Sequence, residues 1–399
     1  MRTRAGWAAI GLLSVQLAAC GARSDLPVGE APPRTTLATP TTCDSVPGPP
    51  GARGVLELAA GPAHTCARLD DGTVWCWGDN SRGQLGDGTH VDRGVPTLVA
   101  GLSDVVQVAA GGVRSCEDVG DTSVCGGGHT CALEGDGSVL CWGDTDFDGP
   151  WKEVASPTPI EGLGSVRRIV VGTSEACGIQ DDGSVRCWWS SAETEHAAQE
   201  VPELAGSLAV ASNTLGRCGL DSTGAVRCFI DPWTPGTPSK MDGMASLGAG
   251  GLFVCAWKRD GEGACFGTDG AKVVGRDEIP DHELLDWQTQ PPLDCGADWI
   301  VGSEHACRST TDGRLWCWGA TAHDKLGVDA EPSPNGWTTI QPLPLEVPGL
   351  AGVMGGAAGH DHTCALTAAA ILCWGSNSDG QLGDGTAGGD RAEPAPVVW

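Results

Sequence analysis

The stretch HTCARLDDGTVWCWGDNSRGQLGDGT, residues 64–89, decides the fold because it returns later in the chain. Near the other end, residues 362–386 read HTCALTAAAILCWGSNSDGQLGDGT. A stretch that recurs in this way is a repeat unit, and repeats spaced by tens of residues indicate a solenoid, a propeller or a linear array. The repeat is therefore the first feature to explain.

Pairs of cysteines mark the unit along the chain. They are Cys66 with Cys76, Cys131 with Cys141, Cys177 with Cys187, Cys218 with Cys228, Cys255 with Cys265, Cys307 with Cys317, and Cys364 with Cys373. Short turns such as LDDGTV lie between the partners, and Asp-Gly is a strong hairpin signal. The spacing is ten residues in every pair except the last, where it is nine and the turn is shorter by one. Opposed residues in an antiparallel pair have Cα atoms about 4.5–5.5 Å apart, so each pair is predicted to form a disulfide across its hairpin.

Two further strands complete each unit. An apolar stretch such as VVQVAAG (105–111) precedes a hairpin, and a proline-flanked stretch such as VPTLV (95–99) follows one. Four short strands in a unit of roughly 40–60 residues are typical of a β-propeller. The aromatic residue after the second cysteine points to the opposite strand face and is expected to pack against the neighbouring unit. It is Trp77, Trp142, Trp188, Phe229, Phe266, Trp318 or Trp374.

The complete pattern resembles the regulator of chromosome condensation repeat family. It is intact at 58–89 and 357–386, and partial at 128–144 and 302–327. Its most specific words are the loop Gly83-Gln84-Leu85-Gly86 and the copy at Gly380–Gly383. The resemblance implies an all-β fold, a seven-bladed propeller over residues 55–399. The repeats are expected near 55–104, 105–165, 166–206, 207–244, 245–294, 295–352 and 353–399.

One irregularity lies in the second unit. Cys116 and Cys125 follow the strand 105–111, before the next regular pair. We interpret them as an inserted hairpin with its own disulfide, and a truncated eighth blade is the alternative. By elimination, Cys43 and Cys295 are left as a possible pair.

The first residues read as a targeting segment. Arg2 and Arg4 precede an apolar run at 7–19 that is short for a membrane span, and the run ends in LAAC. This resembles a bacterial lipoprotein signal, with cleavage after residue 19 and lipid on Cys20; an ordinary signal peptide is the alternative. Residues 20–54, rich in proline, threonine and glycine, are expected to form a tether. Gly21 after the lipidated cysteine favours the outer membrane, an oxidising location that suits disulfides.

The charge and the missing motifs limit the function classes. With 51 acidic and 24 basic residues the formal charge is −27, which disfavours nucleic-acid binding. The chain lacks tyrosine, which removes the sialidase nucleophile, and it lacks G-x-S-x-G, H-E-x-x-H and the phosphate-loop motif. We therefore predict a protein that is not an enzyme and has no cofactor. An enzyme acting on envelope polysaccharide remains an alternative.

Two motifs give weak signals for a metal. DTDFDG places Asp144, Asp146 and Asp148 as the start of a calcium loop, but Ala155 stands where a glutamate is required, so a degenerate repeat loop is favoured. A calcium-dependent adhesion module remains open. A histidine two residues before a cysteine recurs in four units and is interpreted as a packing position. These histidines are His64, His129, His305 and His362.

The leading hypothesis is a monomeric, lipid-anchored propeller that binds a protein partner. The namesake of the family exchanges nucleotide on a nuclear GTPase and contacts chromatin, and an acidic envelope protein is expected to meet neither. Units between about Cys177 and Gln290 depart most from the repeat. Trp189, Trp233 and Trp287 are the candidate partner-binding residues there, because loop aromatics commonly anchor interfaces. Simple sequence drift is the alternative explanation.

Overall fold

A computed structural model describes most of the chain beyond the tether. The described ranges are 54–113, 115–119, 122–144, 153–173, 175–188, 198–213, 216–230, 242–251, 253–258, 263–267, 285–286, 299–328 and 340–399. They all belong to one compact unit, residues 48–399. Within these ranges, no helix has the length and apolarity that a membrane span requires. Several predicted site residues lie outside them: Cys20, Cys43, Asp146, Asp148, Trp189, Trp233, Trp287 and Cys295.

Short antiparallel strands form successive sheets along the chain. The first sheet contains β1 (Val55–Ala60), β2 (His64–Leu69), β3 (Val74–Gly78) and β4 (Arg93–Leu98). The second contains β5 (Val105–Gly111), β8 (His129–Glu134), β9 (Val139–Asp144) and β10 (Glu153–Pro159). The third contains β11 (Val166–Val171), β12 (Ala176–Gln180), β13 (Val185–Trp188) and β14 (Gln199–Glu200). The fourth contains β15 (Ser207–Asn213), β16 (Gly216–Asp221) and β17 (Val226–Ile230).

The remaining sheets repeat this order. The fifth contains β18 (Ser246–Ala249), β19 (Phe253–Trp257), β20 (Gly263–Gly267) and β21 (Leu285–Asp286). The sixth contains β22 (Trp299–Val301), β23 (His305–Ser309), β24 (Leu315–Ala320) and β25 (Ile340–Glu346). The seventh contains β26 (Val353–Ala358), β27 (His362–Thr367), β28 (Ile371–Ser376) and β29 (Asp390–Pro396). Two 3-10 turns, η1 (Pro202–Leu204) and η2 (Ala322–Asp324), lie in loops.

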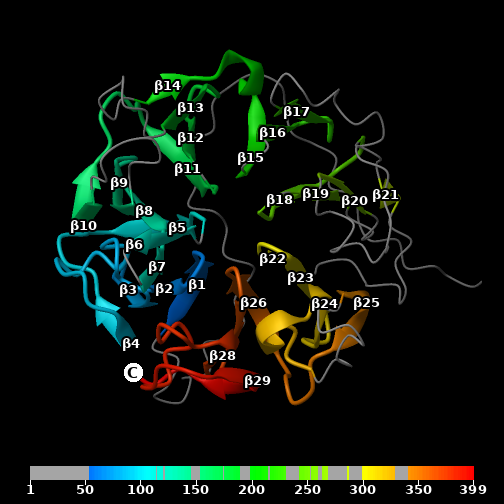
Figure 1. The fold of residues 1–399 in the computed structure, drawn as a ribbon. Coiled ribbons are helices and arrows are strands. Elements are labelled where there is room, and N and C mark those ends of the chain that lie inside the picture. The colour runs from blue at the N-terminus through cyan, green and yellow to red at the C-terminus, as the bar shows by residue number, and fades with distance from the viewer. Residues whose placement is uncertain are drawn as a thin grey trace, which may run out of the picture. The chain divides into compact units, whose positions relative to one another are not determined.

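The sheets stand around a common axis with their first strands innermost (Figure 1). Each inner strand contacts the inner strand of the next sheet, and β1 contacts β26, so the first and last sheets close the ring. The all-β propeller predicted from the repeat is confirmed. Among the described residues, six sheets are complete blades of four strands, and the fourth sheet has three. Its chain continues into 231–241, outside the described residues, so the count of seven blades stays a prediction.

The cysteines lie opposite one another in the hairpins, as their spacing predicts. Six of the predicted disulfides are described, with Cα–Cα distances of 4.0–4.1 Å, a little shorter than expected for opposed residues. They join Cys66 with Cys76, Cys131 with Cys141, Cys177 with Cys187, Cys218 with Cys228, Cys307 with Cys317, and Cys364 with Cys373. Closing a loop of ten residues stabilises a hairpin by about 2–3 kcal/mol in the chain-entropy model. The disulfides thus staple thin blades.

The seventh predicted pair lies in the fifth sheet. Cys255 is disulfide-bonded, and the strand register places Cys265 opposite it. This arrangement matches the other hairpins and supports the predicted bond between the two residues.

An additional hairpin interrupts the second sheet. Strand β5 pairs directly with β8, whereas β6 (Ser115–Val119) pairs with β7 (Thr122–Gly126) in a sheet of their own. The register sets Cys116 opposite Cys125, and the disulfide between them stays a prediction. The hairpin is therefore an insertion between the first and second strands of this sheet, as the sequence predicted.

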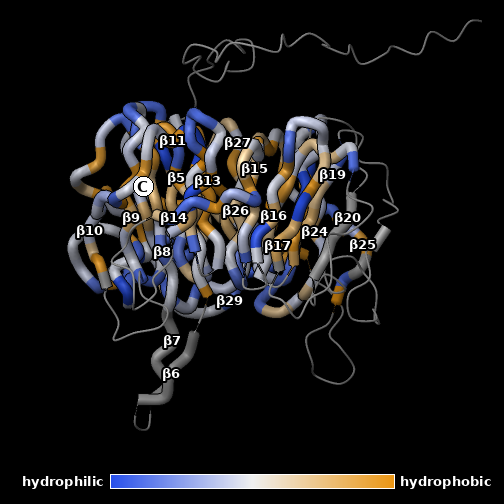
Figure 2. The backbone as a smooth tube through the Cα atoms, turned by 90° about the horizontal axis from the view of Figure 1, so that it is seen from above, coloured by the Kyte–Doolittle hydropathy of each residue, from blue (hydrophilic) through white to orange (hydrophobic). Residues whose placement is uncertain are grey.

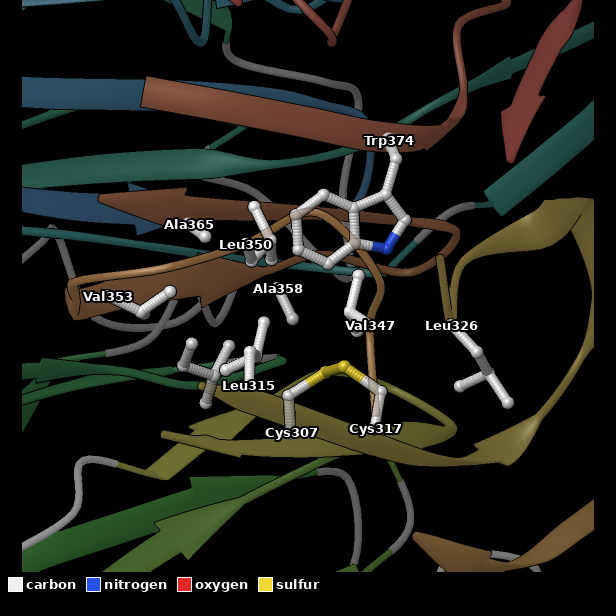
Figure 3. Close-up of a cluster of buried hydrophobic side chains, with 11 residues drawn as sticks. Cys307, Leu315, Cys317, Leu326, Val347, Leu350, Val353, Ala358, Ala365 and Trp374 are labelled. Carbon is white, nitrogen blue, oxygen red and sulfur yellow. A yellow bond between two sulfur atoms is a disulfide. The ribbon is translucent and has the colours of Figure 1, made fainter. Parts of the chain in front are cut away.

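The hydrophobic core lies between neighbouring sheets. Figure 2 shows hydrophobic residues mainly along the strands and many hydrophilic ones in the loops at the two rims. Figure 3 shows one junction, where Trp374 of the seventh sheet packs near the disulfide of Cys307 with Cys317 in the sixth sheet and near Val347 and Leu350, which follow β25. In this junction the disulfide forms part of the surface against which the next sheet packs.

Candidate functional site

Histidine and threonine join neighbouring sheets at the start of their second strands. His64 Nε2 lies 2.9 Å from Thr130 Oγ1 of the second sheet. His362 bonds Thr65 across the ring closure at 2.9 Å, and His305 bonds Thr363 at 2.7 Å. All these side chains are buried. The histidine position that the sequence assigned to packing is therefore a hydrogen-bonding position between blades.

A loop carbonyl completes each of these junctions. The Gln84 carbonyl accepts hydrogen bonds from Thr130 Oγ1 and Trp142 Nε1, both at 2.9 Å. The Gln381 carbonyl accepts from Thr65 and Trp77 at 3.2 and 3.0 Å. The Lys325 carbonyl accepts from Thr363 and Trp374 at 2.8 and 3.0 Å. The Gly-Gln-Leu-Gly loop and its relatives thus dock onto the next blade, where the tryptophan packs as expected.

The second glycine of the loop is required by this contact. Gly86, Gly327 and Gly383 all have φ near +70°, where side chains are strained. A Cβ on any of them would lie 2.7–2.8 Å from the indole nitrogen of the tryptophan. Only glycine lets the loop backbone approach the ring so closely.

The loop side chains make different contacts in different units, within the unit for Gln84 and across a junction for Lys325. Gln84 Nε2 donates to Asp79 Oδ2 at 2.7 Å. Burial raises the pKa of Asp79 to about 6. Lys325, with a side chain 0% exposed, donates to Asp361 at 2.7 Å and lies 3.3 Å from Glu304. Burial alone would raise the pKa of Asp361, but the hydrogen bond from His360 and the charge of Lys325 hold it well below its usual range.

Three of the buried histidines, His64, His129 and His305, are neutral at physiological pH. Burial lowers the pKa of His64 to about 3 and that of His129 to about 4. Burial also holds the pKa of His305 well below its usual range. A general base requires a pKa near the working pH and access to a substrate. These three imidazoles have neither property, so their role is structural.

A second group of junctions replaces these residues. We define the repeat arc as the first, second, sixth and seventh sheets, and the divergent arc as the third to fifth sheets. In the divergent arc, Glu175 stands in the histidine position and Arg217 in the threonine position of the next sheet. They form an ion pair of 2.7 Å, and Ser212 also donates to Glu175. In the fifth sheet, Phe253 takes the histidine position and packs near Ala306 and Trp318.

Two arrangements of metal-ligand type involve described residues, and the first of them is occupied by other bonds. Glu175 lies near Cys177 and Cys187, but these cysteines form a disulfide and Glu175 is paired with Arg217. Asp144 is buried and its backbone N–H donates to Gly128 O, as that of Asp79 donates to Ala63 O. Asp144 therefore occupies the position of Asp79 in its sheet, which supports a degenerate repeat loop.

A cavity of about 330 Å³ lies among the inner strands. Its wall contains glycine, alanine and valine from all the inner strands. Gln107 bridges two of them, because it accepts from Ile169 N and donates to Ile169 O. The cavity is thus the central channel of the propeller.

The sequence did not reveal the structural role of the Gly-Gln-Leu-Gly loop and of the recurrent histidines. The backbone carbonyls of the loop glutamines and the side chains of the histidines form hydrogen bonds across the junctions. The recurrence of these motifs together with the tryptophan was the signal available in the sequence. Of the predicted partner-binding residues, Trp189, Trp233 and Trp287 lie outside the described residues, so that site remains a prediction. The predicted lipidation site, Cys20, also lies outside the described residues and remains a prediction.

Comparisons with known proteins agree with the fold. Models of the regulator of chromosome condensation (RCC1) repeat match residues 71–116, 55–84 and 124–148. The chain is 26% identical to the ultraviolet-B receptor UVR8 of Arabidopsis thaliana, over 88% of this chain and 82% of that protein. It is 24% identical to protein pim1 of Schizosaccharomyces pombe over 86% of this chain, but spans only 63% of pim1.

Solved structures show the same architecture. Human WBSCR16 superposes with a TM-score of 0.58 at 18% identity, over 78% of this chain and 87% of that one. Prp20p of Saccharomyces cerevisiae superposes with a TM-score of 0.50 at 17% identity, over 86% of this chain and 77% of that one. At these identities the likeness concerns the fold alone. Together with the matched repeats and the ring of sheets, it shows that this chain carries regulator of chromosome condensation repeats and folds as an all-β propeller of that type.

Proposed function

We propose that this protein is a non-enzymatic platform that binds a protein partner and is held at a bacterial envelope by lipid on Cys20. The main support is that the side chains of the repeat motif that could take part in catalysis are buried between blades. His64, His129 and His305 are neutral, and the tryptophans and threonines donate to loop carbonyls. In the described part of the chain, the repeat therefore supplies a rigid scaffold, and function is left to the surface.

A similar propeller supports a protein as the partner. Prp20p is described with binding properties toward Gsp1p and histones. Those partners are proteins of another setting. What transfers to this chain is the class of ligand only, because propeller identity does not determine the partner.

The envelope location rests on the sequence. LAAC at 17–20 follows a short apolar run, and a tether of proline, threonine and glycine leads to the propeller. The numerous disulfides suit an oxidising compartment.

Two experiments test the proposal. Cys20→Ser should abolish lipid labelling and move the protein from the membrane to the soluble fraction. Crosslinking in the native envelope followed by capture of the full chain should recover a specific protein partner. Unchanged membrane association of Cys20→Ser would refute the anchor. Hydrolysis of envelope polysaccharide by the purified protein would refute the platform.

A further inference from the structure

Five inner strands carry the same irregularity at their first residues. In β1, β5, β11, β15 and β26 the pairing register slips by one residue, which is a β-bulge. The extra residue in each strand belongs to no pair. These residues are Leu56, Val106, Arg167, Leu208 and Met354.

Four of these bulge residues are hydrophobic and exposed to solvent. Their exposed fractions are 55% for Leu56, 47% for Val106, 50% for Leu208 and 54% for Met354. Bulges commonly re-aim a side chain. In four of the five strands the bulge thus turns an apolar side chain outward, whereas β11 carries Arg167 at this position. Burial in the core does not explain the four exposed apolar side chains.

Three of these side chains come from adjoining blades. Strand β1 contacts β26 on one side and β5 on the other, so Met354, Leu56 and Val106 follow one another around the ring (Figure 1). In their strands, the residues that line the central cavity begin at Leu58, Gln107 and Ala358, so the crescent lies toward the start of each strand. We call these three residues the apolar crescent. Its seventh-sheet end continues into a turn with exposed Ala368 and Ala369.

Carboxylates lie beside two of the three crescent residues, at the starts of β1 and β5. The turn residue Asp70 donates its N–H to the carbonyl of Gly54, just before β1, and Gly135 donates to Asp104 O, just before β5. These bonds hold the hairpin turns beside the starts of the inner strands. The nearby Arg68 is bonded to Glu57 at 3.0 Å. Exposed acids at these positions are Asp70, Asp71, Asp104 and Asp136.

The pKa of one of these acids, Asp71, is lowered by its neighbours. Hydrogen bonds from the side chain and backbone of Thr73 lower its pKa. A rim of this kind attracts cations and repels anionic surfaces.

We propose that the apolar crescent is a docking surface for a protein segment whose aliphatic or aromatic side chains are flanked by lysine or arginine. The inference rests on the proposed platform function and names its surface. An apolar centre within a charged rim is the anatomy of specific interfaces, and the acidic rim selects a basic flank. A second copy of this chain is disfavoured, because face-to-face crescents would bring two acidic rims together. An anionic membrane is disfavoured for the same reason.

The test uses the full chain, a random-peptide library displayed on phage, and three variants. The crescent variant carries Leu56→Ser, Val106→Ser and Met354→Ser. The matched control carries Leu98→Ser, Leu343→Ser and Val398→Ser, which removes similarly exposed apolar side chains from outer parts of the sheets. The rim variant carries Asp70→Asn, Asp104→Asn and Asp136→Asn. All six apolar positions are exposed, so the melting temperature should stay close to that of the wild type.

We expect the enriched peptides to contain apolar residues flanked by lysine or arginine. A synthetic peptide from this pool should bind the crescent variant at least tenfold more weakly and the control as the wild type. The rim variant should lose most of the dependence of binding on salt. Enrichment of acidic peptides, no enrichment, or equal binding by the crescent variant would overturn the proposal.

Envelope capture separates this inference from the platform function. If the crescent variant still captures the native partner, the platform stands and the crescent is not its site. If the peptide results hold but the wild type captures no protein, the surface stands and the platform function fails. Stronger peptide binding after deletion of residues 21–53 would identify the tether of this chain as the occupant and refute an external partner.

Discussion

Neighbouring blades are joined by different side-chain interactions in the repeat arc and in the divergent arc. In the repeat arc, histidine and threonine share a hydrogen bond while tryptophan and a loop carbonyl share another. In the divergent arc, Glu175 and Arg217 hold the equivalent positions as an ion pair, and Phe253 packs without a polar bond from its side chain. The repeat motif is thus one of several ways to join neighbouring blades. The ring requires a contact at each junction, but not these particular residues.

The largest contrast is expected from the aromatic after the second cysteine. Trp374 is fully buried in the repeat arc, whereas Phe229 in the divergent arc is 39% exposed. Trp374→Ala should lower the free energy of unfolding by about 3–5 kcal/mol, the cost of emptying a large buried position. Phe229→Ala should cost less than about 1 kcal/mol. Urea titration of both variants measures this, and equal losses would remove the distinction between the arcs.

The polar junctions come next. Glu175→Gln leaves Arg217 beside a neutral partner and should cost about 2–3 kcal/mol, below the value for fully buried pairs because Arg217 is partly exposed. Thr130→Val removes one hydroxyl at constant shape and should cost about 1–1.5 kcal/mol. The double variant Glu175→Gln, Arg217→Met should recover part of the loss. A larger cost for Thr130→Val than for Glu175→Gln, both measured by urea titration, would contradict the assignment of the ion pair.

Acid should weaken the repeat arc through its histidines. His64 has a pKa near 3 when folded and an ordinary value of 6.5 when unfolded, so the unfolded chain binds a proton that the folded chain excludes. Its contribution is complete above pH 6.5 and is lost as the pH falls toward 3. The slope is about 1.4 kcal/mol per pH unit. The variant His64→Gln should be less steeply destabilised between pH 6 and pH 4, as measured by chemical denaturation; an unchanged slope would show that His64 is already charged.

The smallest pH effect has the opposite sign. The pKa of Asp79 is raised to about 6, so the folded chain binds a proton that the unfolded chain lacks between pH 6 and about 4. Stability from this group rises as the pH falls through that window, which is narrower than the window of His64. Asp79→Asn should therefore make the overall loss of stability in this range slightly steeper, as followed by chemical denaturation at each pH. A shallower profile would contradict the raised pKa.

The hairpins could be predicted because the cysteine spacing follows the turn length, shortening by one where the last turn does. The junctions were harder to predict. Where Glu175 and Arg217 replace histidine and threonine, the repeat motif is lost from the sequence although the contact between the blades is kept. Lys325 stands at the glutamine position of its loop and reads in the sequence as simple divergence from the repeat. The apolar crescent could not be predicted, because a stretch such as VLELAAG does not reveal that its second residue is a bulge. Bulges depend on the register with the partner strand.

The central claim is that the residues of the repeat motif hold the ring of blades together, and that the partner binds to other residues on the surface. The direct measurement is partner capture from the native envelope, alongside the free energy of unfolding, for Gln84→Ala and Gln381→Ala. Both side chains are buried in the loops whose carbonyls bond to the next blade. The account predicts that these variants unfold more easily but, while folded, capture the partner as the wild type does. Lost capture at unchanged stability would place the binding site on the repeat words and contradict the account.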